Sequence, residues 1–275
     1  MGRISNIFAA AARGRNDKIK TMSTVDKHKI AWITGAGKGI GRGLAMRLAH
    51  EGWFVCVTSR TAPELESLKE LCPSGSVEPY LLDVTDREAT ERTIQEIEER
   101  YGSIDLAVLN AGSHSEVLAQ TISVEPFRNL IETNYMSVVY GLCSLVPRFV
   151  QRKRGHIAVV ASLAGYGGLP SAAAYGASKA AIINMCEALY PELRRSKVKL
   201  TLINPGFVKT PLSDKNAFPM PFLISVEKAV DYILRGISAE KFEVTFPFRF
   251  AFLMKIMGLL PYPVYFAITR WMLRS

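Results

Sequence analysis

The chain has 275 residues, a length that suits one large domain with a continuous hydrophobic core. Hydrophobic residues make up 48% of it and charged residues 21%, which is typical of a globular protein and excludes extensive disorder away from the ends. The four cysteines are widely scattered and form neither a CxxC pair nor a cluster with histidine. The sequence therefore predicts neither a zinc site nor a disulfide framework.

The formal net charge of +9 comes from the two ends of the chain. Residues 1–29 carry a net charge of +5 and residues 249–275 carry +4, whereas the residues between them are neutral overall. Apolar, basic ends on a neutral body favour contact with an anionic membrane surface over contact with DNA or RNA. We therefore divide the chain into a basic leader (1–28), a globular domain (29–247) and a hydrophobic, basic tail (248–275).

Apolar strands and helices alternate along the globular domain. In chain order, strands are predicted at 29–34, 53–60, 77–86, 104–112, 155–162, 198–206 and 242–247. Helices are predicted between them at 42–52, 62–72, 87–102, about 124–152, 173–194 and 227–237. This alternation predicts right-handed βαβ units and hence an α/β fold, a doubly wound parallel sheet of the Rossmann type with helices on both faces. Ligands of such sheets bind at the carboxyl ends of the strands.

A glycine-rich turn, TGAGKGIG, joins the first strand to the first helix. Its glycines depart from strict GxGxxG spacing, and a turn of this kind can also be a simple tight connection. Glycines nevertheless permit close approach of a diphosphate, and the amide end of the following helix points at the negative charge. The order of strand, turn and helix therefore predicts a dinucleotide site made of Gly35, Gly37, Lys38, Gly39, Ile40 and Gly41.

The second strand ends in Thr-Ser-Arg, at a position where an enzyme that uses NAD usually carries an acid for the ribose hydroxyls. Arg60 takes that position here, and Lys38 lies inside the glycine turn. Two cations without a carboxylate suit the 2′-phosphate of NADP(H). We therefore predict NADP(H) over NAD(H); the alternative is that Arg60 is an ordinary surface arginine.

Further motifs follow at the ends of the later strands and on the helices between them. In chain order they are LDV (82–84), LNAG (109–112), Asn134 in ETNYMSVVYG, AS (161–162), YGASK (175–179) and NPGFVKTP (204–211). With the glycine turn, they resemble the short-chain dehydrogenase/reductase family over roughly residues 29–246. Each motif alone is weak evidence, but seven motifs in the right order are specific.

The resemblance implies a catalytic tetrad of Asn134, Ser162, Tyr175 and Lys179. It also implies that the cofactor contacts Asp83, Val84, Asn110, Ala111, Gly112, Tyr175, Lys179, Pro205, Gly206, Val208 and Thr210. Asp83 and Val84 would lie at the adenine, and Val208 and Thr210 at the nicotinamide carboxamide. Homodimers and homotetramers are common in the family.

The chemistry of these residue types supports that assignment. Tyr175 and Lys179 are four residues apart on a predicted helix, so their side chains share a face. Tyrosine, with an ordinary pKa of about 10, is a poor base at neutral pH, and a neighbouring ammonium should lower that pKa. Ser162 would orient the substrate oxygen while Tyr175 exchanges a proton with it. By the resemblance, Asn134 would hold a water that links Lys179 to solvent.

Other polar residues of this region are not expected to react. Tyr166 has Pro170 four residues on in place of a cation, so we expect it to form a wall of the substrate site. Ser178 points about 100° away from Lys179 on the helix. The four histidines are isolated from one another and from acids at metal spacing, so we expect ordinary surface or helix-end histidines and no metal.

The segment after NPG, residues 207–225, is rich in Phe, Met, Leu and Pro. It predicts an apolar pocket for a lipophilic carbonyl or alcohol, although the same residues could equally pack a closed lid. The tail carries no acid, and its longest uncharged run, 14 residues, is interrupted by two prolines. Since about 20 apolar residues span a bilayer, a spanning helix is disfavoured. A monotopic segment in the membrane interface is favoured over an arm packed on the body or on a second subunit.

The leader is basic but lacks the apolar core of a secretory signal. Gly2 invites myristoylation, yet Asn6 stands where Ser or Thr is needed. A transit peptide, a disordered extension, or a segment upstream of a true start at Met22 are the alternatives. We expect a cytoplasmic protein that contacts a membrane surface peripherally.

Taken together, the motifs predict an NADP(H)-dependent oxidoreductase that acts on CH–OH groups and interconverts a carbonyl and a secondary alcohol. Two alternatives come from other classes: a dinucleotide-binding sensor without chemistry, and a lipid-binding protein at a membrane surface whose functional part is the tail. The residues of the tetrad argue against the sensor, and no residue names the substrate.

Overall fold

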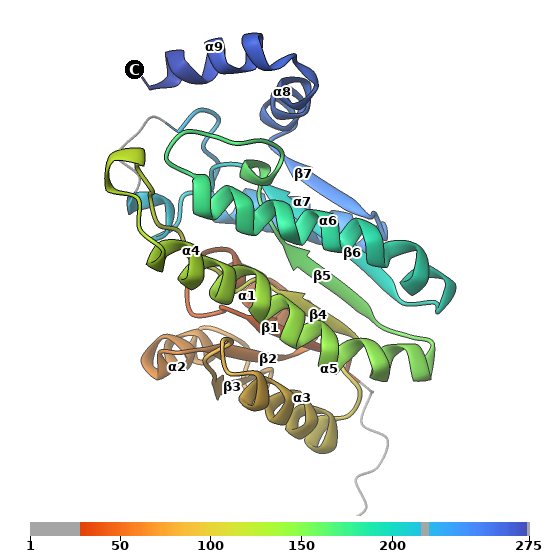
Figure 1. Cartoon of the computed structure of the whole chain (residues 1–275). Helices are drawn as coiled ribbons and strands as arrows, with labels where there is room; N and C mark the ends of the chain where they lie inside the picture. Colours follow the sequence, from red (N-terminus) through yellow and green to blue (C-terminus); the bar gives the residue numbers. More distant parts are fainter. Residues whose placement is uncertain (1–27, 216–219, 274–275) are drawn as a thin grey trace, which may run out of the picture.

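The computed structural model describes residues 28–215 and 220–273. The predictions for the leader therefore lie outside the described residues, apart from its last position. The described chain forms one parallel sheet of seven strands in the order β3-β2-β1-β4-β5-β6-β7, with helices on both faces (Figure 1), which confirms the predicted fold class.

The elements lie close to where the sequence placed them. The strands are β1 (Ile30–Thr34), β2 (Phe54–Ser59), β3 (Val77–Leu81), β4 (Leu106–Leu109), β5 (His156–Val160), β6 (Lys199–Pro205) and β7 (Glu243–Phe246). The helices are α1 (Gly39–His50), α2 (Ala62–Glu70), α3 (Arg87–Tyr101), α4 (Glu125–Leu130), α5 (Ser137–Arg152), α6 (Ala173–Arg195), α7 (Val226–Ser238), α8 (Phe248–Leu259) and α9 (Tyr262–Met272).

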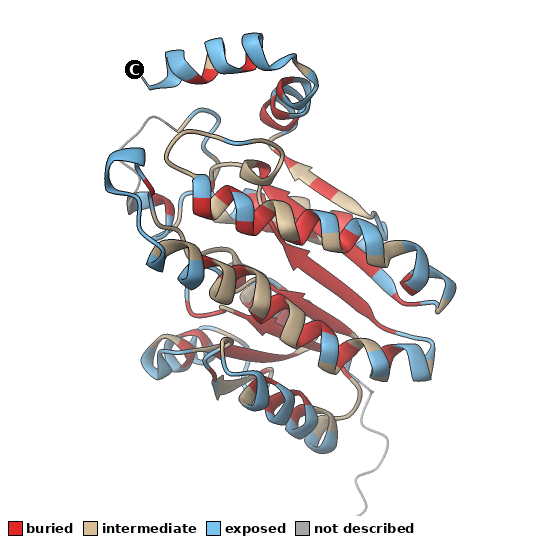
Figure 2. Ribbon diagram, viewed as in Figure 1, coloured by how far each residue is buried: buried red, intermediate tan, exposed pale blue. Residues whose placement is uncertain are grey.

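Each face of the sheet buries its own hydrophobic core, because side chains alternate between the two faces along a strand. In β1, Trp32 belongs to the core that α3, α5 and α6 cover, whereas Ile33 belongs to the core under α1, α2 and α7. Both residues are fully buried, and the central strands are buried along their whole length (Figure 2). The rigid sheet holds the strand ends, where the predicted site residues lie, in fixed positions.

The predicted helix over about 124–152 is continuous but irregular. A π-helical segment, Ile131–Met136, joins α4 to α5, and Asn134 lies within it, fully buried. Segments of π-helix in longer helices often occur at functional sites because the extra residue changes where a side chain points. Periodicity alone does not reveal such an insertion.

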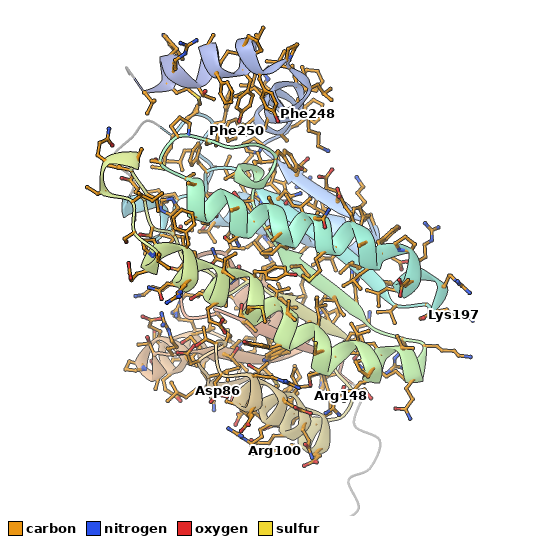
Figure 3. The ribbon with its side chains drawn as sticks, in the orientation of Figure 1. Asp86, Arg100, Arg148, Lys197, Phe248 and Phe250 are labelled. Carbon is orange, nitrogen blue, oxygen red and sulfur yellow. The ribbon has the colours of Figure 1, made fainter. Side chains whose placement is uncertain are left out.

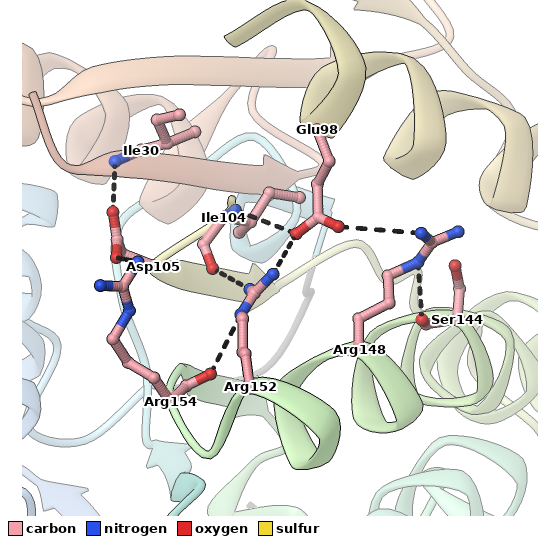
Figure 4. Close-up of polar contacts among 8 residues, drawn as sticks. All are labelled: Ile30, Glu98, Ile104, Asp105, Ser144, Arg148, Arg152 and Arg154. Carbon is pink, nitrogen blue, oxygen red and sulfur yellow. Dashed lines mark hydrogen bonds and ion pairs between the residues drawn. The ribbon is translucent and has the colours of Figure 1, made fainter. Parts of the chain in front are cut away.

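A network of ion pairs lies at the end of the sheet where the strands begin, opposite the strand ends that carry the motifs (Figure 4). Glu98 at the end of α3 accepts a hydrogen bond from the Ile104 amide at 3.1 Å and pairs with Arg152 of α5 at 2.6 Å. Nearby, Asp105 pairs with Arg154 at 3.3 Å and accepts from the Ile30 amide at 3.1 Å. The network joins α3 and α5 to the starts of β1 and β4, far from the strand ends that carry the motifs.

The tail folds into α8 and α9, beyond the carboxyl ends of β6 and β7 (Figure 1). A third, smaller hydrophobic core lies under these helices and includes Phe250, Met254, Met257 and Tyr265 of the tail and Leu163 of the body. One face of the tail is therefore packed on the body, as the alternative to a membrane segment predicts. None of the described helices combines the length and the apolar character needed to cross a bilayer.

Candidate active site

The glycine turn after β1 is fixed against the loop after β4. Gly35 has a φ of +64°, and a Cβ at this position would lie only 2.8 Å from the Cα of Ala111. The Asn110 side-chain amide donates to the carbonyl oxygens of Thr34 and Gly35 at 3.0 and 3.2 Å. The Thr34 hydroxyl oxygen accepts in turn from the amides of Asn110 and Ala111. Two motifs that are far apart in the sequence therefore form one rigid edge of the site.

The amino terminus of α1 fits a phosphate group. The side chain of the N-cap residue, Lys38, makes no capping hydrogen bond, and the first turn of the helix contains no acid. The amide groups of such a turn attract an anion, which the helix dipole favours further. Thr210 lies across the turn, since a Cβ at Gly39 would be 3.0 Å from its Cγ2 atom. Residues from the turn and from the segment after β6 therefore border the same space.

The expected pair of unopposed cations near the end of β2 is only partly present. Arg60 is exposed. Lys38, however, forms an ion pair of 2.7 Å with Glu64 of α2. The end of β2 carries no acid, as the sequence shows, but the fold brings a carboxylate of α2 beside Lys38. Arg60 lies near Asp83: burial alone would raise the pKa of that carboxyl, but hydrogen bonds from Thr85 and the charge of Arg60 outweigh it and lower the pKa.

Ser162, Tyr175 and Lys179 meet beyond the carboxyl end of β5. Ser162 follows this strand, and its hydroxyl lies close enough to the phenol of Tyr175 on α6 to lower the pKa of that phenol. Its hydroxyl also accepts from the Ala164 amide at 3.1 Å, so the loop fixes its position. Lys179 is buried one turn further along α6, with its Nζ atom 5.8 Å from the centre of the Tyr175 ring. Nζ donates to the Val160 carbonyl oxygen at 3.0 Å.

The pKa of Tyr175 differs from the sequence-based expectation. Burial raises it, and the hydrogen bond from Ser162 opposes this only in part. Burial also lowers the pKa of Lys179 to about 8, because the apolar surroundings disfavour its charged form. The expected lowering of the tyrosine pKa by a neighbouring ammonium is therefore wrong for this state of the protein. Tyr175 is a protonated phenol at neutral pH.

Asn134 is held rigidly beside Lys179. Its Oδ1 atom accepts from the Ser113 amide at 2.7 Å, and its Nδ2 atom donates to the Ser113 carbonyl oxygen and to the Ser178 hydroxyl. A Cβ at Gly112 would be 3.2 Å from Asn134 Oδ1 and 3.4 Å from Lys179 Nζ. Both polar atoms therefore face the same small space at Gly112. Ser178, set aside by the sequence analysis, is fully buried and positions Asn134.

Two of the four histidines are neither surface nor helix-end residues. His114 is half-buried with its ring edge-on to Tyr175, the centroids 4.9 Å apart, and burial lowers its pKa. His156 is buried in β5, bonds to the Thr201 hydroxyl at 2.8 Å, and has a pKa lowered to about 4, chiefly by burial. Only the fold brings His114 to the tyrosine, since 61 residues separate the two in the sequence.

Tyr166 does have a cation partner, contrary to the prediction. Lys255 of α8 lies over its ring, with Nζ 5.5 Å from the centroid, and donates to Glu243 of β7 at 2.5 Å. The Tyr166 hydroxyl donates to the same carboxylate and accepts from the Asn204 side-chain amide at 3.1 Å. Burial raises the pKa of Tyr166, and its bond to Glu243 raises it further. The Tyr166 hydroxyl is therefore part of a hydrogen-bonded group, with Glu243 and Lys255, that joins the tail to the body.

The segment after β6 packs against α8. The rings of Phe207 and Phe222 are stacked on Phe250, with centroids 5.5 and 6.0 Å from it. Gly206 allows this approach, because a Cβ there would lie 2.7 Å from the Phe250 ring. Pro205 accepts from the Ser162 hydroxyl at 3.4 Å, and Val208 is buried. Apolar side chains from three separate segments thus surround the region beyond Ser162.

Comparisons with known proteins agree with this arrangement. A family model described as short chain dehydrogenase matches residues 29–218. An uncharacterized oxidoreductase of Myxococcus xanthus is 40% identical over 245 residues, which cover 88% of this chain and 97% of that protein. A 3-oxoacyl-(acyl-carrier-protein) reductase of Thermotoga maritima is 32% identical over 189 residues, covering 68% of this chain and 77% of the reductase.

Solved structures share the fold at lower identity. A short-chain dehydrogenase from Streptomyces avermitilis has a TM-score of 0.75 and 24% identity, covering 89% of this chain and 96% of that one. One from Sphingobium yanoikuyae, in complex with NADPH, has a TM-score of 0.73 and 24% identity over 80% of this chain and 88% of that one. One from Burkholderia phymatum, in complex with NAD, has a TM-score of 0.72 and 23% identity over 80% and 89%.

Proposed function

The chain belongs to the short-chain dehydrogenase/reductase family of NAD(P)-dependent oxidoreductases, and we propose that it interconverts a lipophilic ketone and its secondary alcohol with NADP(H). The observation that carries the proposal is the placement of the Ser162 hydroxyl beside the Tyr175 phenol, close enough to influence its pKa, with the buried Lys179 next to the Tyr175 ring. Two hydroxyl groups that meet in this way can both bind one substrate oxygen.

The protein residues have distinct roles in the proposed reaction. When bound, the nicotinamide supplies or accepts the hydride. Tyr175 is protonated at neutral pH, so it can donate its proton to the oxygen of a reduced carbonyl without prior activation. Ser162 orients that oxygen through its own hydroxyl, which the Ala164 amide holds in place. Lys179, with a pKa of about 8, holds or releases a proton close to physiological pH.

Asn134 and Lys179 are the groups that we propose for returning a proton to Tyr175. The Oδ1 atom of Asn134 accepts one hydrogen bond from the Ser113 amide, and its second lone pair can accept another from a water molecule. That atom and Lys179 Nζ both lie within 3.4 Å of the Cβ position at Gly112. A water in this space would accept from Nζ and donate to Oδ1, as a proton relay to solvent requires.

The residues that border the proposed cofactor site support a dinucleotide. The uncapped first turn of α1 suits the diphosphate, and the exposed Arg60 suits a 2′-phosphate. Glu64 beside Lys38 favours a second candidate, NAD(H), because a carboxylate there could accept from ribose hydroxyls. We favour NADP(H), since the Lys38–Glu64 pair is more than half exposed on the lysine side and a phosphate can displace it.

The apolar surroundings of Ser162 support a lipophilic substrate. Leu163 is buried in the core under the tail, and Phe207 packs against the same core. Tyr166 also borders that core, but its hydroxyl donates to Glu243 and is not free for a substrate. Apolar walls with few free polar groups offer few hydrogen-bond partners to a sugar or an acid, so they favour a hydrophobic substrate.

Replacing Tyr175 by Phe tests the proposed acid/base. We expect the rate of NADPH-dependent reduction of a lipophilic ketone panel to fall by about 10²–10⁴-fold, the usual contribution of a positioned acid. The matched control is Tyr190→Phe, which removes the same hydroxyl from the same helix about 22 Å away along its axis. Turnover of Tyr175→Phe at the rate of this control would overturn the assignment.

Replacing Arg60 by Asp tests the cofactor preference. We expect the ratio of kcat/KM for NADPH over NADH to fall by about 10–100-fold, because a 2′-phosphate would lose a charged hydrogen bond worth about 1.5–3 kcal/mol and meet a like charge. Glu64→Gln should shift the ratio the other way, since it frees Lys38 for the phosphate. A preference that ignores both substitutions contradicts the assignment to NADP(H).

A further inference from the structure

Helix α8 is apolar apart from Arg249 and Lys255, yet only one side of it is buried. Phe250, Ala251, Met254 and Met257 face the body at helical spacing. Six side chains on the other sides of α8 and α9 are each more than half exposed, and we call them the tail patch: Phe248, Phe252, Leu259, Tyr262, Phe266 and Trp271. A helix that is hydrophobic all round is normally buried in a core or in a membrane. The outer surface of the tail is therefore apolar but exposed, although apolar side chains of this kind are normally covered by a core or by a membrane (Figures 2 and 3).

The exposed apolar residues of the protein are concentrated in this tail. Of the 20 exposed large hydrophobic side chains among the described residues, 11 lie in residues 248–273. Neighbouring patch residues are in ring contact: Phe248 with Phe252 at 6.2 Å and Tyr262 with Phe266 at 5.5 Å between centroids. A contiguous apolar surface of this kind marks a docking site.

The charged residues of the tail itself are all basic. Residues 248–273 contain Arg249, Lys255 and Arg270 and no acid. Glu243 of the body neutralises Lys255, whereas Arg249 and Arg270 are exposed and have no carboxylate partner among the described residues. The partner of this surface must therefore accept large apolar side chains and tolerate or attract cations at their edge.

We propose that the tail patch docks in the surface of an anionic lipid bilayer, with α8 and α9 lying along the interface. Three of the patch residues are Phe, and the others are one Tyr, one Trp and one Leu, the residue types that enter the boundary between head groups and acyl chains. Arg249 and Arg270 would bind the anionic head groups. Helices of 12 and 11 residues, which begin directly after Pro247 and Pro261, are too short to span the bilayer but long enough to lie in its surface.

A second copy of the chain fits this surface less well. In a two-fold dimer the same patch faces itself, so the exposed Arg249 and Arg270 of both copies would approach one another. No described carboxylate in residues 248–273 could compensate these charges. An anionic bilayer supplies both the apolar phase and the counter-charge.

The docked orientation would place the substrate site at the membrane. The buried side of α8 covers Leu163 and Gly206, one residue from Ser162 and from Pro205 respectively. Tyr265 of α9 donates to the Gly168 carbonyl oxygen at 2.8 Å, in the loop that joins Ser162 to α6. A lipophilic substrate could thus pass from the bilayer to the site without crossing bulk water, an extension that rests on the proposed function.

Trp271 provides a direct test in the full-length protein. It is 68% exposed, whereas Trp32 is fully buried and Trp53 is partly buried just before the start of β2, away from the tail, so a change in tryptophan emission on adding vesicles reports mainly on the tail. With vesicles that contain anionic phospholipid we expect a blue shift and quenching by brominated acyl chains. Both signals should be absent in Trp271→Phe, although this variant still sediments with the vesicles.

Sedimentation with vesicles separates the patch from other sources of binding. We expect Phe252→Glu with Phe266→Glu to weaken partitioning by about tenfold or more, since each change removes apolar contact and adds a repelled charge. Leu71→Glu, at an exposed apolar residue of the body, should have no effect. The basic leader is present in every variant, so its attraction to the lipid cancels in the comparison.

Two results would overturn the proposal. One is vesicle binding that the double substitution leaves unchanged. The other is a concentration-dependent dimer in solution that the double substitution dissociates, without any vesicle binding by the wild type. Tyr175→Phe should bind vesicles like the wild type, so failure of the proposed reaction and failure of membrane docking give different results.

Discussion

At the residue scale, the site depends on how burial changes ordinary side chains. Lys179 is 3% exposed and keeps its proton less firmly than a surface lysine, with a pKa of about 8 against an ordinary 10.5. Tyr175 shifts in the opposite sense, so burial favours the neutral form of both groups. The free energy spent on burying Lys179 destabilises the fold, which places this residue among those kept for chemistry and not for stability.

Replacing Lys179 by Met should therefore stabilise the protein in a pH-dependent way. Below pH 8 the lysine is charged in both the folded and the unfolded states, and the full penalty of about 3 kcal/mol applies. Between pH 8 and 10.5 the folded state releases its proton first, so stability rises with pH and the penalty disappears. Allowing about 1 kcal/mol for the lost bond to Val160, we expect a gain of roughly 2 kcal/mol at pH 7.

Urea unfolding at pH 7 and pH 10 measures this gain. The advantage of Lys179→Met should vanish or reverse at pH 10, when the lysine of the folded wild type is neutral. Lys197→Met, at an exposed lysine on the rim of the molecule (Figure 3), serves as the control and should show no such pH dependence. An equal difference at both pH values would contradict the cause given for the shift.

At the scale of elements, two helices are held by polar contacts at their ends and not by apolar packing alone. Arg152, the last residue of α5, pairs with Glu98 and donates to the Arg154 carbonyl oxygen at 3.1 Å (Figure 4). Its guanidinium also lies 4.3 Å from the centre of the Phe149 ring. The side chains of Arg152 and Glu98 are only 20% and 15% exposed. Water screens such a pair weakly, so its loss should affect stability more than the loss of a surface pair.

Arg152→Met should lower the free energy of unfolding by about 2–3 kcal/mol, because Glu98 would keep its burial but lose its close partner. Arg148, at 3.7 Å, replaces that partner only in part. The control Arg92→Met removes an exposed pair with Glu88 and should change stability by less than about 0.5 kcal/mol. Thermal and urea unfolding of the two variants measure the difference; similar losses would show that the network adds no more than a surface pair.

At the scale of the whole molecule, the protein has two large cores, one on each face of the sheet, and a third core under the tail. The third core joins α8 and α9 to the loop that carries Ser162. A polar contact, formed by Glu243, Tyr166 and Lys255, fastens the same interface. The tail thus packs against the loop that follows β5, while its outer surface remains exposed.

Phe250→Ala should loosen the tail without unfolding the sheet. Phe250 is 8% exposed and packs on Gly206 and Phe207, so its loss removes about 3 kcal/mol from the third core. We expect faster hydrogen exchange of the α8 and α9 amides, with the strands unchanged. Phe252→Ala, two residues on and 58% exposed, should leave exchange as it is. Equal protection in both variants would show that the tail does not depend on this core.

Local sequence alone determined the regular elements and the order of the motifs, because alternation, helical spacing and glycine turns act between near neighbours. It placed Tyr175 and Lys179 on one face of α6 and Ser162 at the end of β5, as observed. The tertiary structure decided what each group meets. Glu64 reaches Lys38, His114 reaches Tyr175, and Lys255 reaches Glu243 only through the fold.

The same division explains the wrong pKa expectation and the two faces of the tail. Burial raises the pKa of Tyr175 and lowers that of Lys179, and the spacing of residues in the sequence does not reveal how deeply a side chain is buried. Composition marked the tail as apolar and basic, but contacts with Leu163 and Gly206 selected which side of α8 is covered. Contacts between distant segments depend on the packing of the whole chain, so no local pattern records them.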